Sequence, residues 1–140
     1  MQQDVPSYIH DTIYALYCGE VYTGNFSPTL EFIDPLVRVH AAPPTLRMFR
    51  RLNALFPHTT IMKLLPLSQV GQQAVFDFEV VYKRHPSHKG QMMRSTLTVI
   101  GNGQEVTHIK EDWRVPLTLS AEALTLLHPI RRVLGRLCGL

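Results

Sequence analysis

The sequence predicts an α+β domain in which helices pack on one face of a curved antiparallel sheet. Helical periodicity occurs near the start, in the stretch before residue 57, and near the end of the chain. Alternating strand patterns follow one another between residues 59 and 114, with no helical pattern among them. Strands that cluster after helices are typical of α+β folds, whereas regular alternation of the two would favour a parallel sheet.

Two helices are predicted in the first half of the chain. Ile9 and Ile13 belong to an apolar pattern with four-residue spacing, and this helix ends near Gly19. The second helix opens at Pro44, because proline suits the first turn of a helix. It ends before Pro57.

One interrupted strand and a four-stranded meander complete the sheet. Residues 30–40 are rich in β-branched and aromatic side chains, but Pro35 cannot donate a ladder hydrogen bond, so this strand is expected to be broken, bulged or at an edge. Gly101-Asn102-Gly103 predicts a tight hairpin turn before the last strand. The meander strands are predicted over residues 59–67, 73–82, 92–100 and 105–114.

The chain is expected to fold as one domain with a C-terminal addition. Ser120 is a suitable N-cap for a last amphipathic helix, which Pro129 kinks or restarts. The main part of the domain is therefore assigned to residues 1–118, and residues 119–140 to a helical extension of it.

Composition and charge restrict the function classes. The chain of 140 residues has no apolar run long enough to span a bilayer and no secretory signal at its start, which favours an intracellular protein, either cytoplasmic or in a mitochondrion or plastid. No phosphate-binding loop, dinucleotide fingerprint or zinc spacing is present, so no cofactor and no metal is expected. Residues 1–40 carry five acids and one base, whereas residues 41–140 carry thirteen bases and six acids.

Four short motifs carry a resemblance to a known family. They are Phe32-Ile33-Asp34-Pro35, a helix that ends Leu52-x-x-Leu55-Phe56-Pro57, the hairpin Thr96-Leu97-Thr98-Val99-x-Gly101-Asn102-Gly103-x-x-Val106, and His108-x-x-x-Asp112-Trp113. Together they resemble the nuclear transport factor 2-like superfamily, including its SnoaL-like members, over about residues 5–115. The resemblance implies an uncharacterised subgroup with a cone-shaped sheet around a pocket, closed by the N-terminal helices.

The resemblance also implies candidate catalytic residues. Asp34 matches the general base of the ketosteroid isomerases in this superfamily, and its alternative role is to cap a turn at the strand break. The position that matches the acidic hydrogen-bond donor of those isomerases falls near Ser95 or Thr96, and neither residue is an acid. SnoaL-like cyclases use a His and an Asp in the region of His108 and Asp112. These two side chains share one face of a strand but lie roughly 13 Å apart, so they could line one pocket without forming a direct pair.

Pocket and partner residues follow from the same comparison and from the distribution of charge. The expected pocket-lining residues are Tyr14, Tyr17, Phe32 and Phe49. The expected partner-binding residues are Lys83, Arg84 and Lys89 of a basic hairpin and Arg131, Arg132 and Arg136 of the last helix. A protein partner or a homodimer is favoured. Peripheral membrane contact through the last helix is an alternative, and nucleic acid is not the expected partner because aromatic side chains are few near the hairpin.

The sequence leaves three functions open. The first, which the sequence favours because the catalytic donors are missing, is a non-catalytic module that acts as an accessory or assembly subunit through protein contacts. The alternatives are a small isomerase or cyclase with Asp34 as general base, or a carrier of an apolar small molecule. An open pocket of several hundred Å³ at Asp34 would favour these alternatives, and a cone filled by side chains would favour the module.

Overall fold

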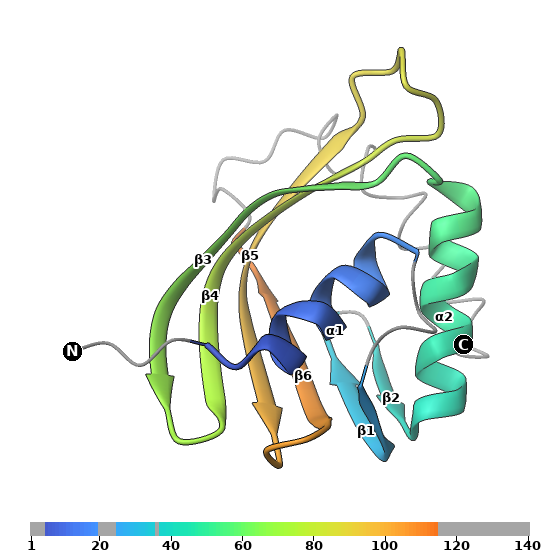
Figure 1. Cartoon of the computed structure of the whole chain (residues 1–140). Coiled ribbons are helices and arrows are strands. Elements are labelled where there is room, and N and C mark those ends of the chain that lie inside the picture. The colour runs from blue at the N-terminus through green and yellow to red at the C-terminus, as the bar shows by residue number, and fades with distance from the viewer. Residues whose placement is uncertain (1–4, 20–24, 36, 115–140) are drawn as a thin grey trace.

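The computed structural model describes residues 5–19, 25–35 and 37–114, and the predicted C-terminal helix lies outside these residues. The elements follow one another in the predicted order (Figure 1). The helices are α1 (Ser7–Tyr17) and α2 (Ala42–Leu55), and neither is long and apolar enough to cross a membrane. The strands are β1 (Phe26–Ile33), β2 (Arg38–His40), β3 (Thr60–Val70), β4 (Gln73–Tyr82), β5 (Gln91–Gly101) and β6 (Val106–Trp113).

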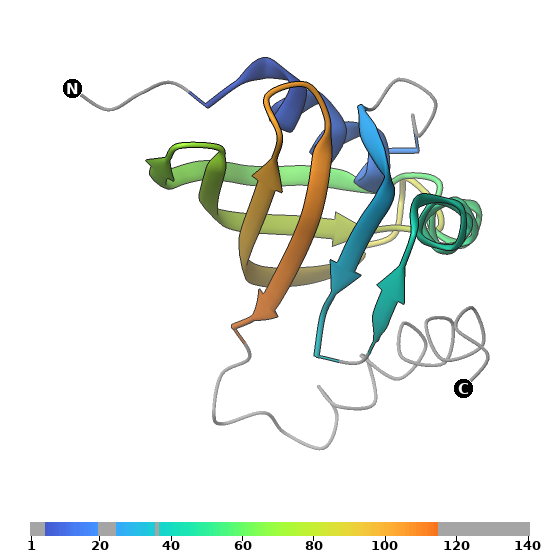
Figure 2. The same cartoon turned by 90° about the horizontal axis from the view of Figure 1, so that it is seen from below.

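The six described strands form one curved, open sheet with the order β2-β1-β6-β5-β4-β3. The predicted meander from β3 to β6 is confirmed, because each strand pairs with the next in antiparallel fashion. The prediction of an entirely antiparallel sheet is wrong at one place, where β1 runs parallel to β6. The cause is the connection through β2 and α2, which carries the chain to the opposite edge of the sheet, so the meander returns to β1 in the same direction (Figures 1 and 2).

Pro35 marks the strand break that the sequence predicts. The chain turns between β1 and β2, which pair in antiparallel register with Phe32 opposite Val39. Asp34 closes this turn: its backbone N–H donates to the carbonyl of Val37 at 3.0 Å. The Asp34 side chain accepts the Val37 N–H at 2.8 Å.

The core lies between the concave face of the sheet and the two helices (Figure 1). Phe49 of α2 meets Tyr17 of α1 and Phe32 of β1 edge to face, at ring-centroid distances of 5.0 and 5.1 Å. Tyr17 also meets Phe78 of β4 at 4.8 Å. These rings join both helices to the sheet, and such contacts add about 0.5–1.5 kcal/mol each beyond the apolar area they bury.

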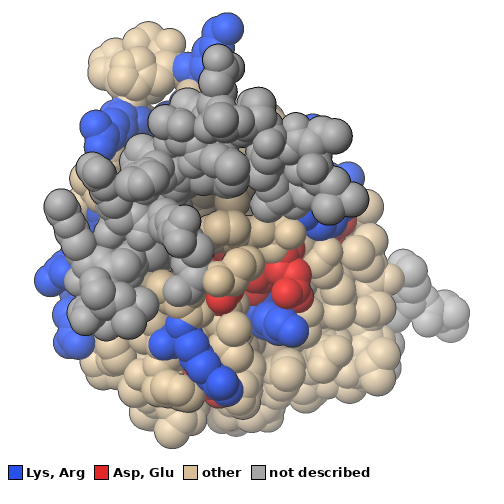
Figure 3. Space-filling model, turned by 180° about the vertical axis from the view of Figure 1, so that it is seen from behind, with Lys and Arg blue, Asp and Glu red and all other residues tan. Residues whose placement is uncertain are grey.

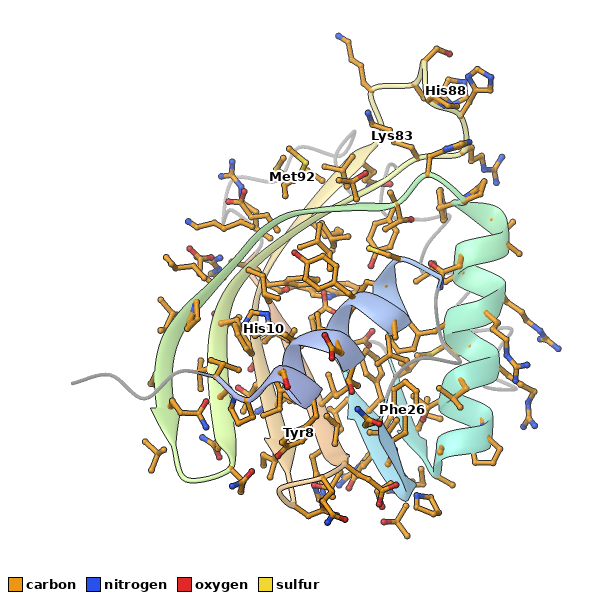
Figure 4. The ribbon with its side chains drawn as sticks, viewed as in Figure 1. Tyr8, His10, Phe26, Lys83, His88 and Met92 are labelled. Atoms are coloured by element: carbon orange, nitrogen blue, oxygen red, sulfur yellow. The ribbon has the colours of Figure 1, made fainter. Side chains whose placement is uncertain are left out.

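The start of α1 is attached to two hairpin turns by Tyr8, which Figure 4 labels. Its hydroxyl donates to Oε1 of Gln72 at 2.6 Å and accepts the N–H of Gly103 at 3.1 Å. The ring lies so close to Gly101 that a Cβ at that position would overlap it. Glycine at position 101 therefore allows α1 to sit directly against the end of β5.

Candidate functional site

A small cavity lies inside the cone, where the ends of β1 and β6 face the two helices. Its volume is about 20 Å³, which is room for about one water molecule. Pockets for small molecules usually measure roughly 300–1,000 Å³, so these side chains occupy most of the place where such a ligand would sit. The cavity is lined by Tyr17, Phe32, Asp34, Met48, Phe49, Leu52, Tyr82, Met93, Glu111 and Trp113.

Glu111 supplies the acidic group that the sequence comparison did not find. It lies on β6, its side chain is buried, and it faces the cavity. The hydroxyl of Tyr17 donates to its Oε2 at 2.7 Å, and the hydroxyl of Ser95 donates to its Oε1 at 3.2 Å. This carboxyl group therefore joins α1 to β5 and β6 inside an otherwise apolar core.

The surroundings of Glu111 favour its neutral form. Burial is the largest cause and the nearby Asp34 adds to it, so that the pKa of Glu111 is raised in total from 4.5 to about 7. Hydrogen bonds from Tyr17, Ser95 and Trp113 oppose the shift without cancelling it. A carboxyl group that titrates near neutrality can donate a proton or accept one at physiological pH.

The two buried tyrosines of the cavity remain protonated. Burial raises the pKa of both Tyr17 and Tyr82 well above 10.0, and the negative charge of Glu111 raises them further. Both phenols are therefore hydrogen-bond donors over the whole physiological range.

Asp34 has a structural partner and also faces the cavity. Its carboxylate caps the turn after β1 through the Val37 N–H, which matches the capped-turn interpretation of the Asp34-Pro35 motif. It is 9% exposed and lines the same cavity as Glu111. Two carboxyl groups and two phenols thus meet in one small, mostly apolar space.

The remaining predicted site residues lie in different places. Tyr17, Phe32 and Phe49 line the cavity, whereas Tyr14 is 45% exposed and is not among the lining residues. His108 and Asp112 lie on the outer face of the sheet, with exposed side chains. The expectation that they line a pocket with Asp34 is therefore corrected.

The correction at β6 has a simple physical reason. Alternate residues of a strand point to opposite faces, so His108 and Asp112 share the outer face while Glu111 points inward. The signal was present in the sequence, because Glu111 has the same parity as the apolar Ile109 and Trp113. A carboxyl group between two large apolar side chains on one strand face indicates a buried acid.

The charges of the outer face are paired with one another. His108 lies beside Glu31, with 3.6 Å between Nε2 and Oε2. In the view from behind, acidic side chains lie next to basic ones (Figure 3). The ion pairs join Arg38 to Glu31 (2.9 Å), Lys63 to Asp77 (2.6 Å), Arg94 to Glu79 (3.4 Å), Lys110 to Asp112 (3.9 Å), and Arg114 to Asp77.

The expected partner-binding residues divide into two groups. Lys83, Arg84 and Lys89 lie in the loop of residues 83–90 between β4 and β5. Arg131, Arg132 and Arg136 lie outside the described residues.

Within the described part of the chain, no group of three or more His, Cys, Asp or Glu side chains is placed to hold a metal ion.

Comparison with solved structures shows the class of fold. No family model and no curated protein matches this chain. A nuclear transport factor 2-like protein of unknown function from Cytophaga hutchinsonii superposes with a TM-score of 0.62 at 8% identity, over 81% of this chain and 94% of that one. A putative SnoaL-like isomerase from Agrobacterium tumefaciens superposes with a TM-score of 0.58 at 14% identity, over 78% of this chain and 96% of that one.

The chain therefore has the curved-sheet fold of nuclear transport factor 2-like proteins. A de novo designed protein with a curved sheet also superposes, with a TM-score of 0.60 at 11% identity, over 94% of this chain and 97% of that one. Because a designed protein shares it, the fold by itself does not specify an activity.

The pKa of Glu111 predicts how stability depends on pH. The folded chain keeps the Glu111 proton up to about pH 7, whereas an unfolded chain releases it near 4.5. The folded state therefore binds more protons in this window, and its stability falls as pH rises through it, by about 3 kcal/mol in total. Glu111→Gln removes this titrating group. As pH rises from 4.5 to 7, the free energy of unfolding of the variant should therefore fall less than that of the wild type. Urea denaturation across the window measures the difference.

Asp112→Asn is the matched control, because it removes the neighbouring carboxyl group from the exposed face of the same strand. The difference in free energy of unfolding between this variant and the wild type should stay constant from pH 4.5 to 7. Parallel curves for Glu111→Gln and the wild type would mean that Glu111 is already ionised in the folded chain.

Proposed function

We propose that this chain is a non-catalytic nuclear transport factor 2-like module that acts as an accessory or assembly subunit through contacts with a protein partner or a second copy of itself. The observation that carries the proposal is the size of the cavity at Asp34, about 20 Å³. An enzyme or carrier of this fold needs a pocket of roughly 300 Å³ or more. The side chains that line the cavity instead interlock with the rest of the core.

The hydrogen bonds inside the cone support the same proposal. Among the described residues, the only buried side-chain polar atom without a hydrogen-bond partner is Oε1 of Gln69, which lies far along the sheet in β3. Both carboxyl oxygens of Glu111 accept hydrogen bonds, one from Tyr17 and one from Ser95. A ligand site normally presents polar groups whose hydrogen bonds are completed only by the ligand.

The module role predicts what accompanies the protein in its cells. The tagged full-length chain, purified from cells of its source organism and weighed by native mass spectrometry, should carry a protein partner or a second copy in fixed stoichiometry. The double variant Asp34→Asn/Glu111→Gln should retain the same assembly, because the contacts lie on the surface and not in the cone. Purification as a single chain, or with a small molecule whose retention needs the two carboxyl groups, would contradict the proposal.

A second candidate function, acid–base catalysis on a small apolar carbonyl compound, is favoured by one observation. Asp34 and Glu111 line the same cavity, and Glu111 titrates near pH 7. Asp34 would take the proton from the carbon next to the carbonyl, and neutral Glu111 would donate a hydrogen bond to the enolate oxygen that forms. The flexible side chains of Met48 and Met93 would have to move aside to admit the substrate.

Hydrogen–deuterium exchange of a panel of small ketones in D₂O tests this second candidate. A catalyst should accelerate exchange, and Asp34→Asn should lower the rate by roughly 10²–10⁴. Asp112→Asn should leave the rate unchanged, because that side chain lies on the outer face. Exchange no faster with the wild type than with Asp34→Asn would exclude Asp34 as a base for these compounds.

A further inference from the structure

The face of α2 that points away from the core carries three arginines. Arg47, Arg50 and Arg51 are all exposed, while the opposite face of the helix is buried. Arg47 and Arg51 are one turn apart, about 6 Å along the helix axis. The helix therefore presents a row of guanidinium groups to its surroundings.

The loop between β4 and β5 continues this row beyond the end of α2. The N–H of His58, just after α2, donates to the carbonyl of Lys83 at 3.1 Å. The guanidinium of Arg84 lies over the ring of Phe56, 5.7 Å from its centroid. Figure 4 shows Lys83 and His88 in the loop that projects beyond the sheet, above the C-terminal end of α2. We call Arg47, Arg50, Arg51, Lys83, Arg84 and Lys89 the basic surface.

The basic surface differs from the outer sheet face in one respect. On the sheet, Arg38, Lys63, Arg94, Lys110 and Arg114 each pair with a carboxylate. Among the described residues, no carboxylate lies within ion-pair distance of Arg47, Arg51, Lys83, Arg84 or Lys89.

The elements that carry the basic surface contain no acidic residues. Residues 35–76 and residues 80–104 contain no Asp or Glu. The first stretch includes all of α2, and the second includes the whole β4–β5 loop. Basic residues on α2 and on the β4–β5 loop, with no acid in either stretch of the sequence, attract a partner that carries negative charge.

We infer that the basic surface binds an acidic peptide segment of a protein partner. This inference rests on the proposed module role and names the chemistry of the partner. Carboxylates one turn apart on a helix are separated by about 6 Å, which matches the spacing of Arg47 and Arg51. An acidic helix laid along α2 would bring further carboxylates to the loop residues Lys83 and Arg84.

The side chains around the surface favour a protein segment over RNA or a membrane. The nearby phenylalanine and tyrosine rings, those of Phe49, Phe56 and Tyr82, are buried and cannot stack on bases. No large exposed apolar side chain belongs to α2 or to residues 83–90 in the described part of the chain, so the surface has no anchor for insertion into lipid. Arginine clusters without such groups are suited to acidic motifs.

Fluorescence anisotropy with the full-length chain tests the inference. The probe is a labelled helical peptide with glutamates one turn apart, and the reference is the same peptide with glutamines in their place. We expect the glutamate peptide to bind more tightly, with an affinity that falls as salt rises. Arg47→Gln/Arg51→Gln and Lys83→Gln/Arg84→Gln should each weaken binding about fivefold, or about 1 kcal/mol in total, because each variant removes two exposed charge pairs.

Arg94→Gln/Lys110→Gln is the matched control, because it removes the same charge from exposed residues of the outer sheet face. It should change the affinity less than twofold. Equal weakening by the control, or equal binding of the two peptides, would overturn the inference. Tighter binding of vesicles rich in anionic lipid, or of single-stranded RNA, through the same residues would overturn it in favour of that ligand.

Failure of this inference is distinguishable from failure of the module role. If a partner co-purifies equally well with the wild type and with both basic-surface variants, the partner binds elsewhere. This result would overturn the assigned surface but agree with the module role. A chain that purifies alone, yet binds the glutamate peptide in the predicted manner, would contradict the module and support the surface.

Discussion

The hydrogen bond between Tyr17 and Glu111 is the interaction on which the interior of the cone depends. It joins the end of α1 to the last strand of the sheet, and Tyr17 in turn contacts Phe49 of α2 and Phe78 of β4. Removal of either partner would leave a buried polar group without its hydrogen bond, which costs about 1–3 kcal/mol. The closed form of the cone therefore depends on a polar contact inside an apolar core.

The same contact explains why a site that resembles a catalytic centre has so little space. Tyr17 and Glu111 are hydrogen-bonded to each other in the wall of the cavity, and Phe32 and Phe49 also line it. The cone thus holds acidic and phenolic groups, of which Tyr17 is bonded to Glu111 and Asp34 to the backbone N–H of Val37. The exposed charged side chains lie outside the cone, on the outer face of the sheet and on the basic surface.

Local signals in the sequence predicted most of the fold. Pro35 predicted the strand break, and Gly101-Asn102-Gly103 predicted the last hairpin, because both act within a few neighbouring residues. The parallel pairing of β1 with β6 was missed, because it depends on where α2 returns the chain and no local pattern encodes that. In the site, Asp34 was found through its motif, whereas Glu111 was passed over for its neighbour Asp112. The position of Glu111 relative to Tyr17 becomes visible only when residues 94 positions apart in the chain are brought together.

The central claim is that Glu111 is a buried carboxyl group held in its neutral form by the folded core. The most direct measurement is a titration of its ¹³C-labelled side-chain carboxyl by NMR spectroscopy, with the resonance assigned through the Glu111→Gln variant. The structure predicts a midpoint near pH 7, together with a change in the environment of the Tyr17 ring at the same pH. A midpoint near 4.5, the ordinary value for this side chain, would contradict the account.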